Sequence, residues 1–207
     1  TLAMTLSKIN INDIEPFVKN CKDFSDRFYF TRLVPVKEED FKIQLSKKEW
    51  LHAMKRILKI ENTQIPLRDP TFCGFFFSPR RAKETLAIAG CSIGYNNIAI
   101  ESNGDIYPCR RLPIVIGNVY DNDLSQVWRA LLLEQLRNRD NLTGKCGDCN
   151  YRWICGGCRG IAYAMHKDPL AEDPGCPMPF SKSKESLSFL PGNNKTITIN
   201  TKNRLFF

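Results

Sequence analysis

The sequence predicts an α/β protein in which a strand–helix–strand unit precedes a small α+β lobe, rich in cysteine and built around a β-hairpin. A strand–helix–strand pattern, an Asn-Gly pair between two apolar runs, and nine cysteines in 207 residues are the observations behind this prediction. The composition, 43% hydrophobic and 25% charged, is that of a globular protein and excludes a wholly disordered chain. No apolar run approaches the roughly 20 residues of a membrane-spanning helix, which excludes an integral membrane protein.

Residues 1–36 predict a parallel β-α-β unit. Residues 3–6 are short and apolar, and residues 28–36 are aromatic and β-branched, as in strands. Between them, apolar side chains recur at helical spacing after a cap at Asn12 or Asp13; these are Ile11, Ile14, Phe17 and Val18. One such unit leaves the faces of its sheet uncovered. We therefore expect it to be part of a larger α/β domain, and the chain to be cut from a longer protein.

The next helix is predicted over residues 46–60. Ser46 and Glu49 form a capping box, the pattern in which two side chains satisfy the first backbone amides. Its buried stripe comprises Trp50, Ala53, Met54 and Ile57. The proline-containing stretch that follows predicts a linker with one buried patch around Phe75–Phe77.

Residues 97–109 predict a β-hairpin, because Asn103-Gly104 tolerates the positive φ of a type I′ turn. A single amphipathic helix is predicted over residues 123–138. Its inward residues are Leu124, Val127, Trp128, Leu131 and Leu136. A short helix is predicted over residues 158–166, and residues 180–207 predict a basic tail with one possible edge strand at Thr196–Asn200.

Seven cysteines follow a definite layout that predicts iron–sulfur clusters. Cys91 and Cys109 flank the hairpin, and four more crowd into residues 146–158, here called the cysteine block, as C-x2-C-x5-C-x2-C; Cys176 follows. A zinc site is the first alternative, but paired C-x2-C motifs for zinc usually stand about 15–20 residues apart. A set of disulfides is the second alternative, but a chain of this length can bury a hydrophobic core without disulfides.

This layout resembles the SPASM domain, the C-terminal extension of many radical S-adenosylmethionine (radical SAM) enzymes. The resemblance covers about residues 90–177 and includes the segments NGDIYPCRRLPIVIGNV, LSQVWRALLLEQLR, GKCGDCNYRWICGGCRGIAYA and DPGC. One departure is the pair Gly156-Gly157, since three residues often precede the last block cysteine in the family.

The resemblance implies four segments and a specific fold class. Residues 1–62 are expected to be the C-terminal strands and helices of a radical SAM partial (β/α) barrel, residues 63–89 a linker, residues 90–179 the SPASM domain and residues 180–207 the tail. The family's C-x3-C-x2-C motif, which holds the SAM-binding 4Fe–4S cluster, does not occur in this sequence. The chain alone is therefore expected to be inactive, and its parent protein to be the enzyme.

Two auxiliary 4Fe–4S clusters are implied by the resemblance. The distal cluster is expected on Cys146, Cys149, Cys155 and Cys176, and the proximal cluster on Cys91, Cys109 and Cys158. Some relatives supply a further cysteine where this chain has Thr85. The fourth proximal ligand is then either Cys73 or absent, which leaves one iron open. Cys21 is expected to pack as a buried thiol on the barrel helix.

The implied function is radical modification of a peptide or small-molecule substrate, with SAM and a third 4Fe–4S cluster in the parent protein. The auxiliary clusters bind substrate or transfer electrons, and the donor is expected to be a ferredoxin or flavodoxin. The alternatives are a non-catalytic iron–sulfur module and a zinc-binding nucleic-acid module. The net charge of +8 is the observation that favours the nucleic-acid module. Two clusters with their thiolates carry about −2 each, which argues against nucleic acid. Reduced thiols and the lack of an export signal predict the cytoplasm.

Overall fold

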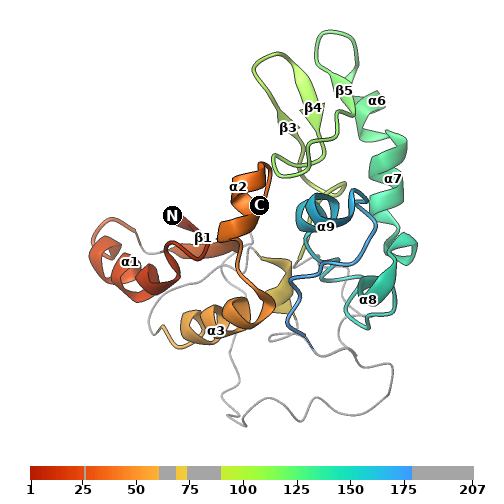
Figure 1. Cartoon of the computed structure of the whole chain (residues 1–207). Coiled ribbons are helices and arrows are strands. Elements are labelled where there is room, and N and C mark those ends of the chain that lie inside the picture. The colour runs from red at the N-terminus through yellow and green to blue at the C-terminus, as the bar shows by residue number, and fades with distance from the viewer. Residues whose placement is uncertain (26, 61–68, 74–89, 179–207) are drawn as a thin grey trace, which may run out of the picture.

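The computed structural model describes residues 1–25, 27–60, 69–73 and 90–178. The predictions for residues 63–68 and 74–89, for the basic tail and for Phe75–Phe77 and Thr196–Asn200 lie outside the described residues. Within the described ranges the elements form two lobes (Figure 1). Helices α1 (Ile14–Cys21) and α3 (Lys47–Ile57) lie with strand β1 (Leu2–Leu6) on one side, and helices α6 (Leu124–Trp128) to α9 (Arg159–His166) lie with the hairpin on the other.

The first lobe confirms the parallel β-α-β unit. Strands β1 (Leu2–Leu6) and β2 (Phe28–Arg32) pair in parallel, with Leu2 opposite Phe28 and Leu6 opposite Arg32. The 3₁₀ turn η1 (Ile11–Asp13) and helix α1 (Ile14–Cys21) connect them. Two details differ from the prediction. Strand β2 ends at Arg32 rather than near residue 36, and the N-cap of α1 makes no side-chain hydrogen bond.

Helix α3 (Lys47–Ile57) forms as predicted. Ser46 and Glu49 complete the capping box, and the four predicted inward residues are all buried. The 3₁₀ turn η2 (Pro70–Phe72) packs against this helix: the ring of Phe72 lies edge-on to Trp50 at 5.6 Å, and Trp50 Nε1 donates to Thr71 Oγ1 at 2.8 Å. The short helix α2 (Glu38–Ile43) was not predicted, because six residues carry no clear amphipathic period.

The hairpin is present, but its turn differs from the prediction. Strands β3 (Ala99–Ile100) and β4 (Asp105–Tyr107) are antiparallel, and β5 (Gly117–Asn118), which was not predicted, extends the sheet beside β4. The turn is not type I′, because four residues connect the strands and Gly104 alone of them has positive φ, at 89°. The Asn103 side chain instead accepts a hydrogen bond from the Asp105 amide at 3.1 Å.

The single helix predicted over residues 123–138 is wrong. Two helices, α6 (Leu124–Trp128) and α7 (Leu131–Arg137), meet at Ala130, whose extended ψ of 137° breaks the helix. The break changes which side chains face inward. Leu124 and Leu131 are 54% and 70% exposed, whereas Leu133, which was not predicted to be inward, is fully buried.

The remaining elements place the cysteine block. The turn η3 (Arg139–Asn141) and the short helix α8 (Gly144–Gly147) precede it, and helix α9 (Arg159–His166) follows it as predicted. A core cluster of this lobe joins the hairpin to α7; its buried members are Cys91, Ile93, Leu112, Leu133 and Leu136.

A buried charge network joins the two lobes. Arg32, at the end of β2, is 4% exposed and contacts Asp69 through Nε at 2.9 Å. Its Nη2 contacts Asp173 at 2.7 Å, and Asp173 also accepts a hydrogen bond from the Cys158 amide at 2.9 Å. Val34 packs with Cys158 and Ile161 beside this network. The end of the first sheet is thereby fixed against the cysteine block. In the part of the chain that is described, no helix is long and apolar enough to cross a membrane.

Candidate metal centre

Two consecutive glycines shape the turn between the last two cysteines of the block. Gly156 and Gly157 have φ values of +65° and +59°, which L side chains rarely adopt. A Cβ on Gly157 would lie 3.0 Å from Cys146 Sγ and 2.6 Å from Arg159 Nη2. The two-residue spacing that departs from the family pattern is therefore a left-handed turn that lets the backbone approach another cysteine of the block closely.

The four predicted distal cysteines lie in one electrostatic neighbourhood. Burial raises the pKa of Cys176 to about 12, and nearby Cys155 adds to that shift. Burial likewise raises the pKa of Cys146 and of Cys149, and for both of them Cys155 contributes as well. Cys155 is therefore the common neighbour of the other three thiols. Cys176 thus lies within electrostatic range of Cys155.

Hydrogen-bond donors surround the distal sulfurs. Cys146 Sγ accepts from the Asp173 amide at 3.3 Å and from Arg159 Nη2 at 3.5 Å. The Tyr151 amide donates to Cys149 Sγ at 3.4 Å, and the Gly157 amide donates to Cys155 Sγ at 3.4 Å. Such donors stabilise thiolates, the form in which cysteine binds iron.

The predicted proximal cysteines come from three segments that meet at the block. The Cys91 amide donates to the carbonyl of Cys155 at 2.8 Å, and Cys91 and Cys109 share the core cluster of the hairpin lobe. Cys158 is buried, which raises its pKa to about 11. Arg111 lies near both Cys109 and Cys158. Burial lowers the pKa of its guanidinium, but Cys158 and Cys109 raise that pKa above its usual value.

Cys73 and Cys21 have different surroundings. The thiol of Cys73 lies next to Cys155, a predicted distal ligand; this neighbour and burial raise the pKa of Cys155 well above its usual value. Cys155 Sγ also donates to the Pro70 carbonyl at 3.1 Å, so the η2 turn covers this side of the block. Cys21 packs against the first core, as predicted, but its side chain is partly rather than fully buried.

Unpartnered buried donors provide a test of whether an iron–sulfur cluster fits. Among the described residues, five buried side-chain atoms lack a hydrogen-bond partner, and they belong to Arg111, Arg139, Tyr151 and Arg159. All four residues adjoin the cysteines: Arg139, for example, donates to the Cys91 carbonyl and faces Gly156. Cationic donors around thiolates suit an anionic cluster. No three His, Cys, Asp or Glu side chains within the described ranges are arranged to hold a metal ion.

Three arginines and one aspartate at this centre were not identified from the sequence. Arg111 and Arg159 follow cysteines closely, and this adjacency was the available signal. Arg139 and Asp173 lie at a distance along the chain, and only the fold brings them to the sulfurs.

Comparison with known proteins finds similarity in the cysteine-rich lobe. Residues 91–150 match the family model of SPASM, an iron-sulfur cluster-binding domain. A protein named AdoMet-dependent heme synthase from Methanosarcina barkeri is 39% identical over 88 residues, which are 42% of this chain and 25% of the relative. Pre-heme d1 synthase of Dinoroseobacter shibae is 33% identical over 99 residues, 45% of this chain and 24% of the relative. The chain thus spans about a quarter of the length of these curated relatives.

A solved structure shows the same fold. The crystal structure of Streptococcus suis SuiB bound to S-adenosylmethionine superposes with a TM-score of 0.55 at 22% identity. The superposition covers 85% of this chain and 44% of SuiB, so the likeness includes the first lobe as well as the cysteine-rich one.

Proposed function

We propose that this chain, a radical SAM/SPASM protein, is the part of a radical SAM enzyme that holds two auxiliary 4Fe–4S clusters near the substrate. The observation that carries the proposal is the set of unpartnered buried donors of Arg139, Tyr151 and Arg159 around the cysteine block, which suits an anionic group that no protein side chain supplies. When bound, the clusters supply electron transfer or a site for a substrate atom. The parent enzyme would bind SAM at a third cluster.

The ligand sets follow the sequence prediction. Cys146, Cys149, Cys155 and Cys176 hold the distal cluster, and Cys91, Cys109 and Cys158 hold the proximal one. The electrostatic influence of Cys155 on Cys146, Cys149 and Cys176 supports the distal set. The position of Arg111 between Cys109 and Cys158 supports the proximal set.

Cys176→Ala tests the distal set. We expect this variant to lose about half of the iron and sulfide bound by the chain, because one of its two clusters loses a ligand. Cys21→Ala is the matched control, since Cys21 packs in the first core. Unchanged iron and sulfide in Cys176→Ala would contradict the assignment. A colourless protein that binds zinc would favour the zinc module instead.

The fourth proximal ligand remains a choice between Cys73 and an open iron. The contact of Cys73 with Cys155 favours the open iron, because it directs this thiol toward the distal set. We expect Cys73→Ser to leave the electron paramagnetic resonance signal of the proximal cluster unchanged. Loss of that signal would make Cys73 the ligand. An open iron accepts a water or substrate atom, whereas a fully ligated cluster only transfers electrons.

The remaining parts of the proposal concern the parent enzyme. Its substrate is a peptide or a small molecule, and the names of the sequence relatives, both heme-related synthases, favour the small molecule. A ferredoxin or flavodoxin supplies electrons, and the enzyme acts in the reducing cytoplasm. Nucleic acid and membrane are not among its proposed partners. Without the parent's SAM-binding cluster this chain alone is inactive.

A further inference from the structure

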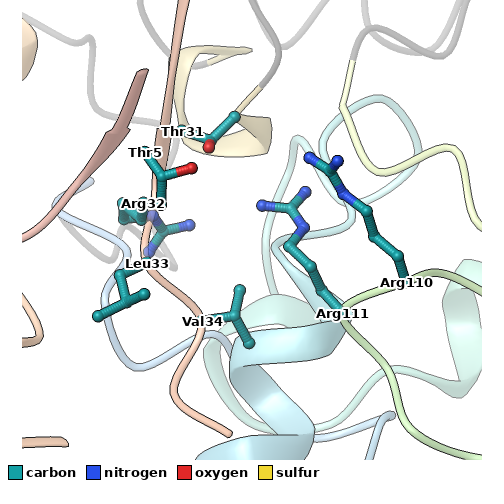
Figure 2. A pocket seen from close by; sticks show the side chains of 7 residues that line it. All are labelled: Thr5, Thr31, Arg32, Leu33, Val34, Arg110 and Arg111. Atoms are coloured by element: carbon teal, nitrogen blue, oxygen red, sulfur yellow. The ribbon is translucent and has the colours of Figure 1, made fainter. Parts of the chain in front are cut away.

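A pocket of about 280 Å³ lies between the strand ends of the first lobe and the loop after Cys109, and is here called the arginine pocket. Its lining residues are Thr5, Thr31, Arg32, Leu33, Val34, Arg110 and Arg111. Figure 2 shows Arg110 and Arg111 extending from the loop, with the residues of β1 and β2 on the other side. Ligands of open parallel α/β sheets bind beyond the carboxyl ends of the strands, which is where this pocket lies.

The three arginines of the pocket differ in whether another side chain already pairs with their charge. Arg32 is held by two buried carboxylates, those of Asp69 and Asp173. Arg111 Nη1 is buried and has no hydrogen-bond partner within the described residues. Arg110 is exposed, and the described residues give its guanidinium no partner either. Arg110 and Arg111 therefore present adjacent cationic donors to whatever enters.

The position of Arg111 is set by the fold. Its backbone packs so closely on the start of α9 that a Cβ on Gly160 would lie 2.6 Å from the Arg111 carbonyl oxygen. The Arg111 amide also approaches Cys109 Sγ at 3.5 Å. A molecule held by Arg111 would consequently lie beside the predicted proximal cluster.

The rest of the lining indicates which anion fits. Leu33 and Val34 form an apolar wall, which suits a hydrocarbon stem next to the charged group. The carboxylates of Asp69 and Asp173 lie close by, as the anionic proximal cluster would, and this negative charge disfavours a dianion such as phosphate. Two guanidinium groups match the two oxygens of a carboxylate.

We propose that the arginine pocket binds a carboxylate carried on an apolar stem, with Arg110 and Arg111 as its donors. The inference deepens the proposed function and rests on it, since the carboxylate would belong to the substrate. The substrate class is thus an organic acid, whose charged end is held at the boundary of the two lobes beside the proximal cluster.

The test uses the full chain with its clusters in place and three probes: 4-phenylbutyrate, its neutral amide, and inorganic phosphate. Saturation-transfer NMR measures binding of the two aromatic probes, and phosphate is added as competitor. We expect the acid to bind the wild type and the amide to bind at least about tenfold more weakly, the size of one charge-assisted contact. Phosphate should compete poorly.

Arginine variants test whether Arg110 contacts the carboxylate of the acid. Arg110→Ala should weaken binding of the acid about tenfold, and Arg110→Lys should recover part of it. Arg129→Ala removes another exposed arginine, at the end of α6, and should change nothing. Equal affinity for acid and amide, no binding of the acid to wild type, or the same loss in Arg129→Ala would overturn the inference.

Iron and sulfide are measured on the same samples. A wild-type chain that selects the acid but holds no cluster would refute the proposed function and leave the carboxylate site standing. A chain with both clusters but no selectivity for the acid would refute the carboxylate site alone.

Discussion

Arg159 connects the fold of the cysteine-rich lobe to the chemistry of one sulfur. It is fully buried, and its Nη1 donates to the carbonyls of Pro169 at 3.0 Å and Ala171 at 2.6 Å. These bonds hold the loop toward Cys176 and aim Nη2 at Cys146 Sγ, 3.5 Å away. A positive charge beside a cluster ligand stabilises the reduced, more negative cluster.

We therefore predict that Arg159→Met lowers the reduction potential of the distal cluster, by on the order of 100 mV for one charge at this range. Redox titration followed by electron paramagnetic resonance measures it. Arg159→Lys keeps the charge and should shift the potential less. The control is Arg129→Met, because Arg129 is exposed at the end of α6. A potential that is the same in Arg159→Met and wild type would remove Arg159 from this role.

At the scale of elements, the turn from Cys155 to Cys158 determines whether the block closes. Gly157 has a left-handed φ and lies in close approach to Cys146 Sγ. We predict that Gly157→Ala destabilises the fold by at least about 1–2 kcal/mol and also lowers the iron bound at the distal site. Denaturant unfolding and iron content measure the two effects.

Gly104→Ala is the matched control for that substitution. Gly104 also has positive φ, at 89°, but the side chains nearest to its missing Cβ are those of Asn118, in β5, and of Tyr120, just after β5. Gly104→Ala should therefore show backbone strain with normal iron content. If both variants keep their iron, the close approach at Gly157 does not govern cluster binding.

The sequence predicted elements well where local signals are strong. The capping box and the stripe from Trp50 to Ile57 place α3 because each depends on residues within a few positions. The break at Ala130 was missed because alanine favours helices and no proline or glycine marks the site. Tertiary packing of Leu133 and Leu136 outweighs that local preference.

At the scale of the whole molecule, the cysteine pattern predicted where the candidate centre lies but not what surrounds it. Seven ligand candidates follow from spacing and resemblance alone. Arg32, Asp69 and Asp173 could not be predicted, because their contacts join residues as many as 141 positions apart. Asp173 contacts Arg32 of the first lobe, and its amide also donates to Cys146 Sγ. One residue thus couples the sheet to the predicted distal site.

The two lobes should therefore differ in how they depend on iron. The first core is apolar and continuous, with Trp50, Met54 and Phe72 buried among its members. The cysteine-rich lobe instead contains buried donors of Arg139 and Arg159 whose remaining partner would be the clusters. In such a lobe the free energy of metal binding contributes directly to folding.

We predict that anaerobic removal of iron by a chelator exposes the amides of α8 and α9 while those of α3 stay protected. Hydrogen exchange followed by mass spectrometry reads each segment separately, and the iron-loaded chain is the reference. The amides of strand β2 should lose part of their protection. Without iron Asp173 is no longer held in place to pair with Arg32, whereas the ion pair of Arg32 with Asp69 remains. Unchanged protection of α9 without iron would mean that side-chain packing alone, such as that of Ile161 against Val34, holds the lobe.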